Sequence, residues 1–114
     1  MAEVSNFNTK ITVGKPDDFT YAYIMGIGGD WSERDNYQCT VNPSASASEG
    51  FQWCYMNLAV GADGASVKGK NGNQWYGTGD TGEGGGDNVS LDASSTYDLY
   101  LNGGTNHILY ANKH

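Results

Sequence analysis

The run FQWCYMNLAV, at positions 51–60, constrains the fold of this chain more than any other stretch, because almost every residue in it is apolar. In an extended strand, alternate side chains point to opposite faces. One face then carries the odd-numbered residues and the other the even-numbered ones, namely Phe51, Trp53, Tyr55, Asn57 and Ala59 against Gln52, Cys54, Met56, Leu58 and Val60. Both faces are largely apolar, so the run predicts a central strand, covered on both sides.

Shorter runs rich in β-branched and aromatic residues lie on both sides of this stretch, and turn-forming residues separate them. Asn71-Gly72 and Asn102-Gly103 are strong hairpin signals. At 96–102 the alternation predicts a strand with one side in water, with an apolar face of Tyr97, Leu99 and Leu101 opposite a polar face of Asp98, Tyr100 and Asn102. The other candidate strands are 9–13, 20–26, 36–41, 65–70, 73–77, 88–91 and 106–111.

The composition agrees with an all-β fold. The chain has 114 residues, including 17 Gly, 8 Tyr and only 2 Pro, and no stretch has a convincing helical pattern. Short strands separated by turns at intervals of about 8–12 residues predict a β-sandwich. The length suits a single domain with one modest core.

The charge and the residue types exclude several classes of function. A net charge of −7 with only six Lys and Arg argues against nucleic acid and against an anionic membrane surface. No apolar run is long enough to cross a bilayer, so we expect no direct membrane insertion by this domain. Its two histidines, His107 and His114, lie near the C-terminus without a nucleophile–base motif, and we therefore expect no enzymatic activity.

Two features leave alternatives open. Cys39 and Cys54 could form one disulfide in an oxidising compartment, or they could be two buried thiols. The acidic loop at 80–87 could hold calcium through Asp80, Glu83 and Asp87, although its spacing does not match an EF-hand. A solvated loop without any cofactor is the interpretation that we favour there.

The tryptophans are the most informative residues. Trp53 lies inside the apolar run and is expected in the core, whereas Trp31 and Trp75 lie among Gly, Asn and Asp residues. A Trp in such a segment can present a flat apolar face to a ligand, and the C–H face of a sugar ring is one partner that stacks there. Tyr76, the next residue after Trp75, points to the opposite side of an extended strand and is expected to pack inward.

The second half of the chain resembles the repeated domain of SusE/SusF-type outer-membrane proteins. The resemblance lies in the order of three pieces, which are VKGKNGNQW at 67–75, GDNV at 86–89 and TYDLYLN at 96–102. In the first half, Gly28-Gly29-Asp30-Trp31 is similar to the Gly-Gly-x-Trp turn of that family. The chain differs from the family at Gly69 and Lys70, where an apolar residue and Arg are common, and in its long glycine-rich loop at 77–86.

This resemblance implies an immunoglobulin-like antiparallel β-sandwich that binds a polysaccharide, with starch or another α-glucan favoured, and does not cleave it. Residues 1–114 would then be one carbohydrate-binding domain of a longer exported protein at the outer-membrane surface or outside the cell, and we expect it to be a monomer. The binding residues implied by position or by the neighbouring loops are Trp31, Trp75, Lys68, Lys70, Asn73 and Asp80. The alternative is a structural spacer or protein-interaction domain of the same fold, in which both tryptophans are packed under their loops.

Overall fold

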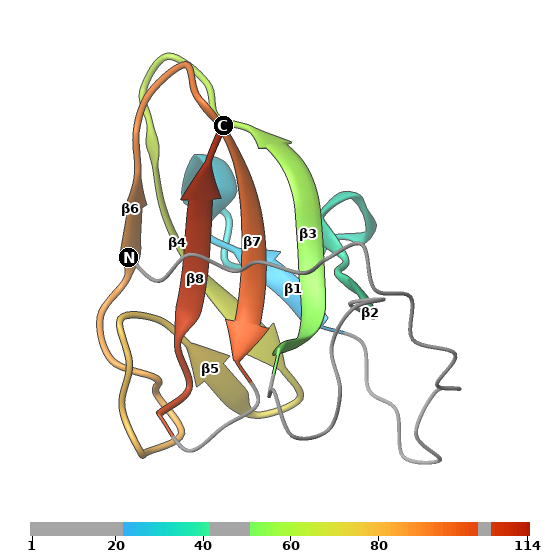
Figure 1. Ribbon diagram of the computed structural model, residues 1–114, viewed down its shortest axis with the longest axis vertical. Coiled ribbons are helices and arrows are strands. Elements are labelled where there is room, and N and C mark those ends of the chain that lie inside the picture. The colour runs from blue at the N-terminus through green and yellow to red at the C-terminus, as the bar shows by residue number, and fades with distance from the viewer. Residues whose placement is uncertain (1–21, 42–50, 103–105) are drawn as a thin grey trace.

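Two antiparallel β-sheets pack face to face in the computed structural model, which describes residues 22–41, 51–102 and 106–114 (Figure 1). One sheet contains β1 (Ala22–Met25), β4 (Ala65–Asn71), β5 (Gln74–Tyr76) and β6 (Val89–Leu91). The other contains β2 (Thr40–Val41), β3 (Phe51–Ala59), β7 (Thr96–Asn102) and β8 (Leu109–Lys113). Two short 3₁₀ turns, η1 (Ile27–Gly29) and η2 (Asp35–Tyr37), follow β1.

The predicted fold class is confirmed, since the described chain is all-β and forms a sandwich of two antiparallel sheets. The predicted strand at 9–13 and the turn at 103–105 lie outside the described residues. In the described residues, no helix is long and apolar enough to cross a membrane.

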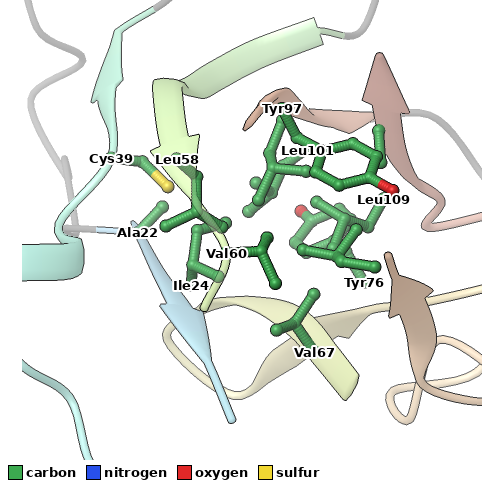
Figure 2. Close-up of a cluster of buried hydrophobic side chains, with 13 residues drawn as sticks. Ala22, Ile24, Cys39, Leu58, Val60, Val67, Tyr76, Tyr97, Leu101 and Leu109 are labelled. Carbon is green, nitrogen blue, oxygen red and sulfur yellow. The ribbon is translucent and has the colours of Figure 1, made fainter. Parts of the chain in front are cut away.

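The core fills the space between the two sheets (Figure 2). Ile24 of β1 and Val67 of β4 meet Leu99 and Leu101 of β7 there, and none of the four is more than 1 % exposed. Burial of such aliphatic side chains, at about 1.5–3 kcal/mol each, is the main stabilising contribution to a domain of this size. The remaining buried members of the cluster are Ala22, Cys39, Leu58, Val60, Tyr76, Leu91, Tyr97, Leu109 and Ala111.

Strand β3 has two register shifts against β7, one between Phe51 and Trp53 and one between Tyr55 and Leu58. The second is a β-bulge that makes the predicted faces of the run 51–60 wrong in its second half. Asn57 has a positive φ of 59°, and the register with β7 shifts between Tyr55 and Leu58. The extra residue reverses the alternation, so Leu58 is buried in the core, on the same side as Tyr55 and Trp53, which pack against it. The Asn57 N–H, which would otherwise lack its ladder partner, donates to Asp98 Oδ1 at 2.8 Å.

Strand β7 has the predicted apolar face, because Tyr97, Leu99 and Leu101 all lie in the core. The expectation of a solvated opposite face is wrong at Tyr100, which is only 2 % exposed. Burial, together with nearby Asp98 and Cys54, raises the pKa of Tyr100 to about 12.

Cys39 and Cys54 are free thiols. Thr40 is the register partner of Cys54 and shares its face, with 3.7 Å between Thr40 Oγ1 and Cys54 Sγ. Cys39, one residue earlier, points to the opposite face and belongs to the core. The two sulfurs therefore lie on different sides of one sheet, and burial raises the pKa of both thiols.

Hydrogen bonds join the two sheets at their edges. Next to β1, the Cys39 N–H donates to Ala22 O at 2.7 Å. On the other side, Gly77 bridges to Ile108, and the Leu109 N–H donates to Gly77 O at 2.8 Å.

Two predicted strands are shorter than expected. The run 36–41 begins in η2, and only its last two residues form β2. The run 106–111 becomes a strand only at Leu109, since His107 has a positive φ of 49° that interrupts extended backbone.

Candidate functional site

The outer face of the β1–β4–β5 sheet carries the candidate site. In β4, Val67 and Gly69 point into the core, so Lys68 and Lys70 point outward, as two residues on the same face of a strand do. A Cβ at Gly69 would lie 2.7 Å from Leu101 Cγ. The glycine that departs from the family pattern is therefore explained by the close approach of Leu101 from the other sheet.

Cross-strand pairing brings Trp75 next to Lys70. Lys70 is the register partner of Tyr23 in β1 and of Trp75 in β5, so the three residues lie in one row across the outer face. Tyr76 points the other way and is 5 % exposed within the core cluster. The prediction that Trp75 and Tyr76 face opposite sides of β5 is confirmed.

Trp31 reaches the same face through a tight turn at 26–30. Gly26, Gly28 and Gly29 all have positive φ, which non-glycine residues adopt at a cost of about 1–2 kcal/mol. The Gly26 N–H donates to Asp30 O at 2.8 Å, closing the turn. A Cβ at Gly26 would lie 2.9 Å from two ring carbons of Trp31, so the indole rests on the bare backbone of Gly26.

The two indoles form a bent apolar surface. Their ring centroids are 6.1 Å apart and their planes are inclined at 56°. Trp31 is 43 % exposed, and Trp75 is partly exposed. At this separation the rings touch each other, so a ligand can lie over the pair but cannot insert between them. We call Trp31 and Trp75 the tryptophan pair.

A charged rim borders the tryptophan pair. Lys70 Nζ lies 5.4 Å from the centroid of the Trp75 ring, in cation–π range, and 3.5 Å from Glu33 Oε2. Glu33 follows Trp31 by two residues, so the segment directly after the 26–30 turn supplies one indole and one carboxylate to the site.

The glycine-rich loop at 77–88 is held against β5 by its carbonyl groups. The Trp75 N–H donates to Glu83 O at 2.8 Å, and Gln74 Nε2 lies within 3.0 and 3.1 Å of Gly82 O and Glu83 O. Lys68 Nζ donates to Gly84 O at 2.7 Å. These hydrogen bonds attach the loop to the edge of the sheet, and Gly85 packs directly on the Trp75 backbone.

These contacts give the other predicted site residues different surroundings. Lys68 shares the outer face with Lys70, but its ammonium is engaged by the loop. The Asp80 carboxylate accepts from the Gly82 N–H at 2.8 Å, and its backbone N–H donates to Asn106 O, which places Asp80 toward the start of β8. Asn73 is exposed in the β4–β5 hairpin turn. The structure thus brings together Trp31, Trp75 and Lys70. Lys68 and Asp80 instead form hydrogen bonds with the backbone of the loop.

One residue of the site, Glu33, was not among the sequence candidates. It pairs with Lys70, and its only sequence signal is its position two residues after Trp31. Gln74, one of the polar residues expected around Trp75, holds the loop carbonyls beside that indole.

In the part of the chain that the structure describes, no three His, Cys, Asp or Glu side chains gather as a metal site would require. Comparisons with protein-family models, with curated proteins and with solved structures found no match to this chain.

Proposed function

We propose that this domain binds a polysaccharide without cleaving it, with sugar rings lying on the tryptophan pair. The observation that carries this proposal is the exposure of Trp31, at 43 %, where it touches Trp75 on the outer face of the sheet. Exposed indoles held by backbone packing keep a fixed apolar surface in water, which is what stacking on a pyranose requires. Lys70 and Glu33 stand at the edge of this surface and can hydrogen-bond sugar hydroxyls.

The inclination of the rings favours a curved glycan over a flat one. A flat, ribbon-like chain would lie best on coplanar aromatic rings, whereas these planes meet at 56°. The helical curvature of an α-glucan such as starch turns successive sugar rings relative to one another and suits a bent surface. We expect weak affinity, with Kd on the order of 10 µM to 1 mM, because few rings are buried and hydroxyls exchange one hydrogen-bond partner for another.

Affinity electrophoresis tests this function. The wild type is run in gels that contain starch, mixed-linkage β-glucan, xylan or mannan, each compared with a gel without polysaccharide and with or without EDTA. We expect retardation in starch that is lost in Trp31→Ala and in Trp75→Ala and is unaffected by EDTA. Met56→Ala is the matched control, because Met56 is also 43 % exposed but lies on β3 of the other sheet.

A spacer or protein-interaction domain is the second candidate, and one observation favours it. Trp31 packs on Gly26 and against Trp75, as a residue that only covers the sheet would. On this alternative, no gel retards the wild type, and Trp31→Ala lowers the thermal stability without any effect on mobility.

A further inference from the structure

An ion pair lies at the rim of the tryptophan pair. Lys70 Nζ is 3.5 Å from Glu33 Oε2 and 5.4 Å from the centroid of the Trp75 ring. The Lys70 side chain is 24 % exposed and that of Glu33 is 44 % exposed, so the carboxylate is the more accessible member. A ligand lying on Trp75 therefore meets a balanced pair of charges at this edge.

We propose that Glu33 determines the charge class of the glycan, so that the site accepts neutral sugars and rejects sugars that carry a carboxylate. This inference rests on the proposed polysaccharide-binding function and adds a residue that selects among polysaccharides. It assigns to Glu33 a specificity role in addition to holding Lys70.

A neutral sugar matches both members of the pair. Its vicinal hydroxyl groups can each donate and accept, so one can accept from the Lys70 ammonium while its neighbour donates to the Glu33 carboxylate. An acidic sugar in the same place would bring its carboxylate toward Lys70 and also toward Glu33. The repulsion from Glu33 offsets the attraction, and specificity then arises from the repulsive element.

Among the residues that the structure describes, the other cations near the site do not replace Lys70. Lys68 donates its ammonium to Gly84 O at 2.7 Å, and Arg34 Nε binds Asp30 Oδ2 at 2.8 Å. The chain as a whole carries a net charge of −7, which further disfavours an acidic polymer. Within the described ranges, Lys70 is thus the cation that an acidic sugar on Trp75 would use, and Lys70 is already paired with Glu33.

The substitution Glu33→Gln tests this assignment. Glutamine keeps the length of the side chain and a hydrogen-bond acceptor but removes the charge, and Asp63→Asn, in the exposed turn between β3 and β4, is the control with the same change in net charge. Each variant and the wild type are run in starch, in polygalacturonate and without polysaccharide. We expect Glu33→Gln to be retarded in starch less than the wild type, because the sugar hydroxyl then donates to an amide oxygen in place of a carboxylate, and to gain about five- to tenfold in apparent affinity for polygalacturonate.

Two further measurements identify the cause of the gain. The gain in affinity for polygalacturonate should disappear in the double variant Glu33→Gln/Lys70→Met. The same gain should weaken in roughly 1 M salt, where charges more than about 3 Å apart are screened. If Glu33→Gln is retarded in starch but gains nothing in polygalacturonate, or if Asp63→Asn gains as much, the role of Glu33 is wrong while the binding function stands. If neither the wild type nor any variant is retarded in any gel, the polysaccharide-binding function fails and this inference fails with it.

Discussion

Two glycine-rich segments border the tryptophan pair, and they are held in place in different ways. The turn at 26–30 closes on itself, with the Gly26 N–H bonded to Asp30 O and the Gly29 N–H bonded to Gly26 O. The loop at 77–88 also has internal bonds, but it is attached to the sheet through Lys68, Gln74 and the Trp75 N–H. The two segments have similar composition, but the turn is closed by its own backbone hydrogen bonds, whereas the loop is held in place by hydrogen bonds to neighbouring strands.

The glycines differ in the same sense. Gly28 and Gly29 supply positive φ angles for the reversal, and a Cβ at either position would have no atom within 4 Å, whereas Gly26 combines a positive φ with close packing. Gly85 also has a positive φ, but its main role is close approach, because a Cβ there would lie 2.2 Å from Trp75 O. A change in the turn should therefore move Trp31, and a change in the loop should move the β5 edge that carries Trp75.

The largest effect is expected from Gly85→Ala, which removes the close contact between the loop and β5. The new Cβ would meet Trp75 O, Trp75 C and Tyr76 N, all within 2.9 Å, and backbone atoms cannot move aside as a side chain can. We expect a loss of about 3 kcal/mol in the free energy of unfolding, measured by urea denaturation. Gly84→Ala is the control, because a Cβ at Gly84 has no atom within 4 Å, and equal midpoints for the two variants would contradict the packing described here.

A smaller loss is expected from Gly26→Ala in the turn. Its φ is +98°, and the new Cβ would lie 2.5 Å from Ser66 O and 2.9 Å from the Trp31 ring, which can shift. We expect a cost of about 2 kcal/mol in unfolding free energy, together with a change in tryptophan fluorescence as Trp31 moves.

Gly28→Ala separates backbone strain from contact in the turn. Gly28 has a φ of +63° and open space around its Cβ position, so only the conformational cost of about 1 kcal/mol is expected. A Gly28→Ala variant as unstable as Gly26→Ala would show that contact with Trp31 and Ser66 contributes nothing.

Gln74→Ala tests the dependence of the loop on its neighbours directly. It removes the amide that lies within 3.1 Å of Gly82 O and Glu83 O, at an expected cost of about 1 kcal/mol. Amide hydrogen exchange should accelerate at Gly79, whose N–H is bonded to Gly85 O inside the loop. The Gly29 N–H, inside the turn, is the internal control, and equal acceleration at both amides would argue against two separately held segments.

The smallest effect concerns pH and distinguishes the turn from the loop. The Ser32 N–H and Arg34 hold the pKa of Asp30 below its usual value. A carboxyl with a lowered pKa in the folded state stabilises the fold above its unfolded-state pKa and loses that contribution as the pH falls through its folded-state pKa. We therefore expect the Ser32 amide resonance to shift below about pH 4, without a comparable change at Trp75, whose N–H is bonded to a backbone carbonyl.

Asp30→Asn is the control for this titration. Asparagine keeps an acceptor for Ser32 but does not ionise, so the acid shift of the Ser32 amide should vanish in the variant. A shift that persists would assign the change to another carboxyl group.

Much of the strand pattern was predictable because alternation and turn chemistry act over short distances. The hairpin at Asn71-Gly72 and the inward face of β7 follow from neighbouring residues alone. The bulge at Asn57 was not predictable, because an extra residue is recognised only by the register of the partner strand. The separation of Cys39 and Cys54 onto two faces likewise depends on the pairing of β2 with β3.

The candidate site divides in the same way. Alternation within β4 was enough to place Lys68 and Lys70 on one face, and the contrast between Trp75 and its buried neighbour Tyr76 also came from strand geometry. The position of Trp31 beside Trp75 was expected only from the resemblance to a known family, since no local pattern relates the two residues.

By itself, the sequence determined that the described part of the chain is all-β, that Tyr97, Leu99 and Leu101 of β7 face inward, and that Asn71-Gly72 reverses the chain direction. These properties depend on residues within a few positions of each other. Only the tertiary structure decided that Lys68 binds the loop while Lys70 meets Glu33, a residue 37 positions away. Two lysines on the same face of one strand thus have different roles, because the segments that fold over them present a backbone carbonyl to Lys68 and a carboxylate to Lys70.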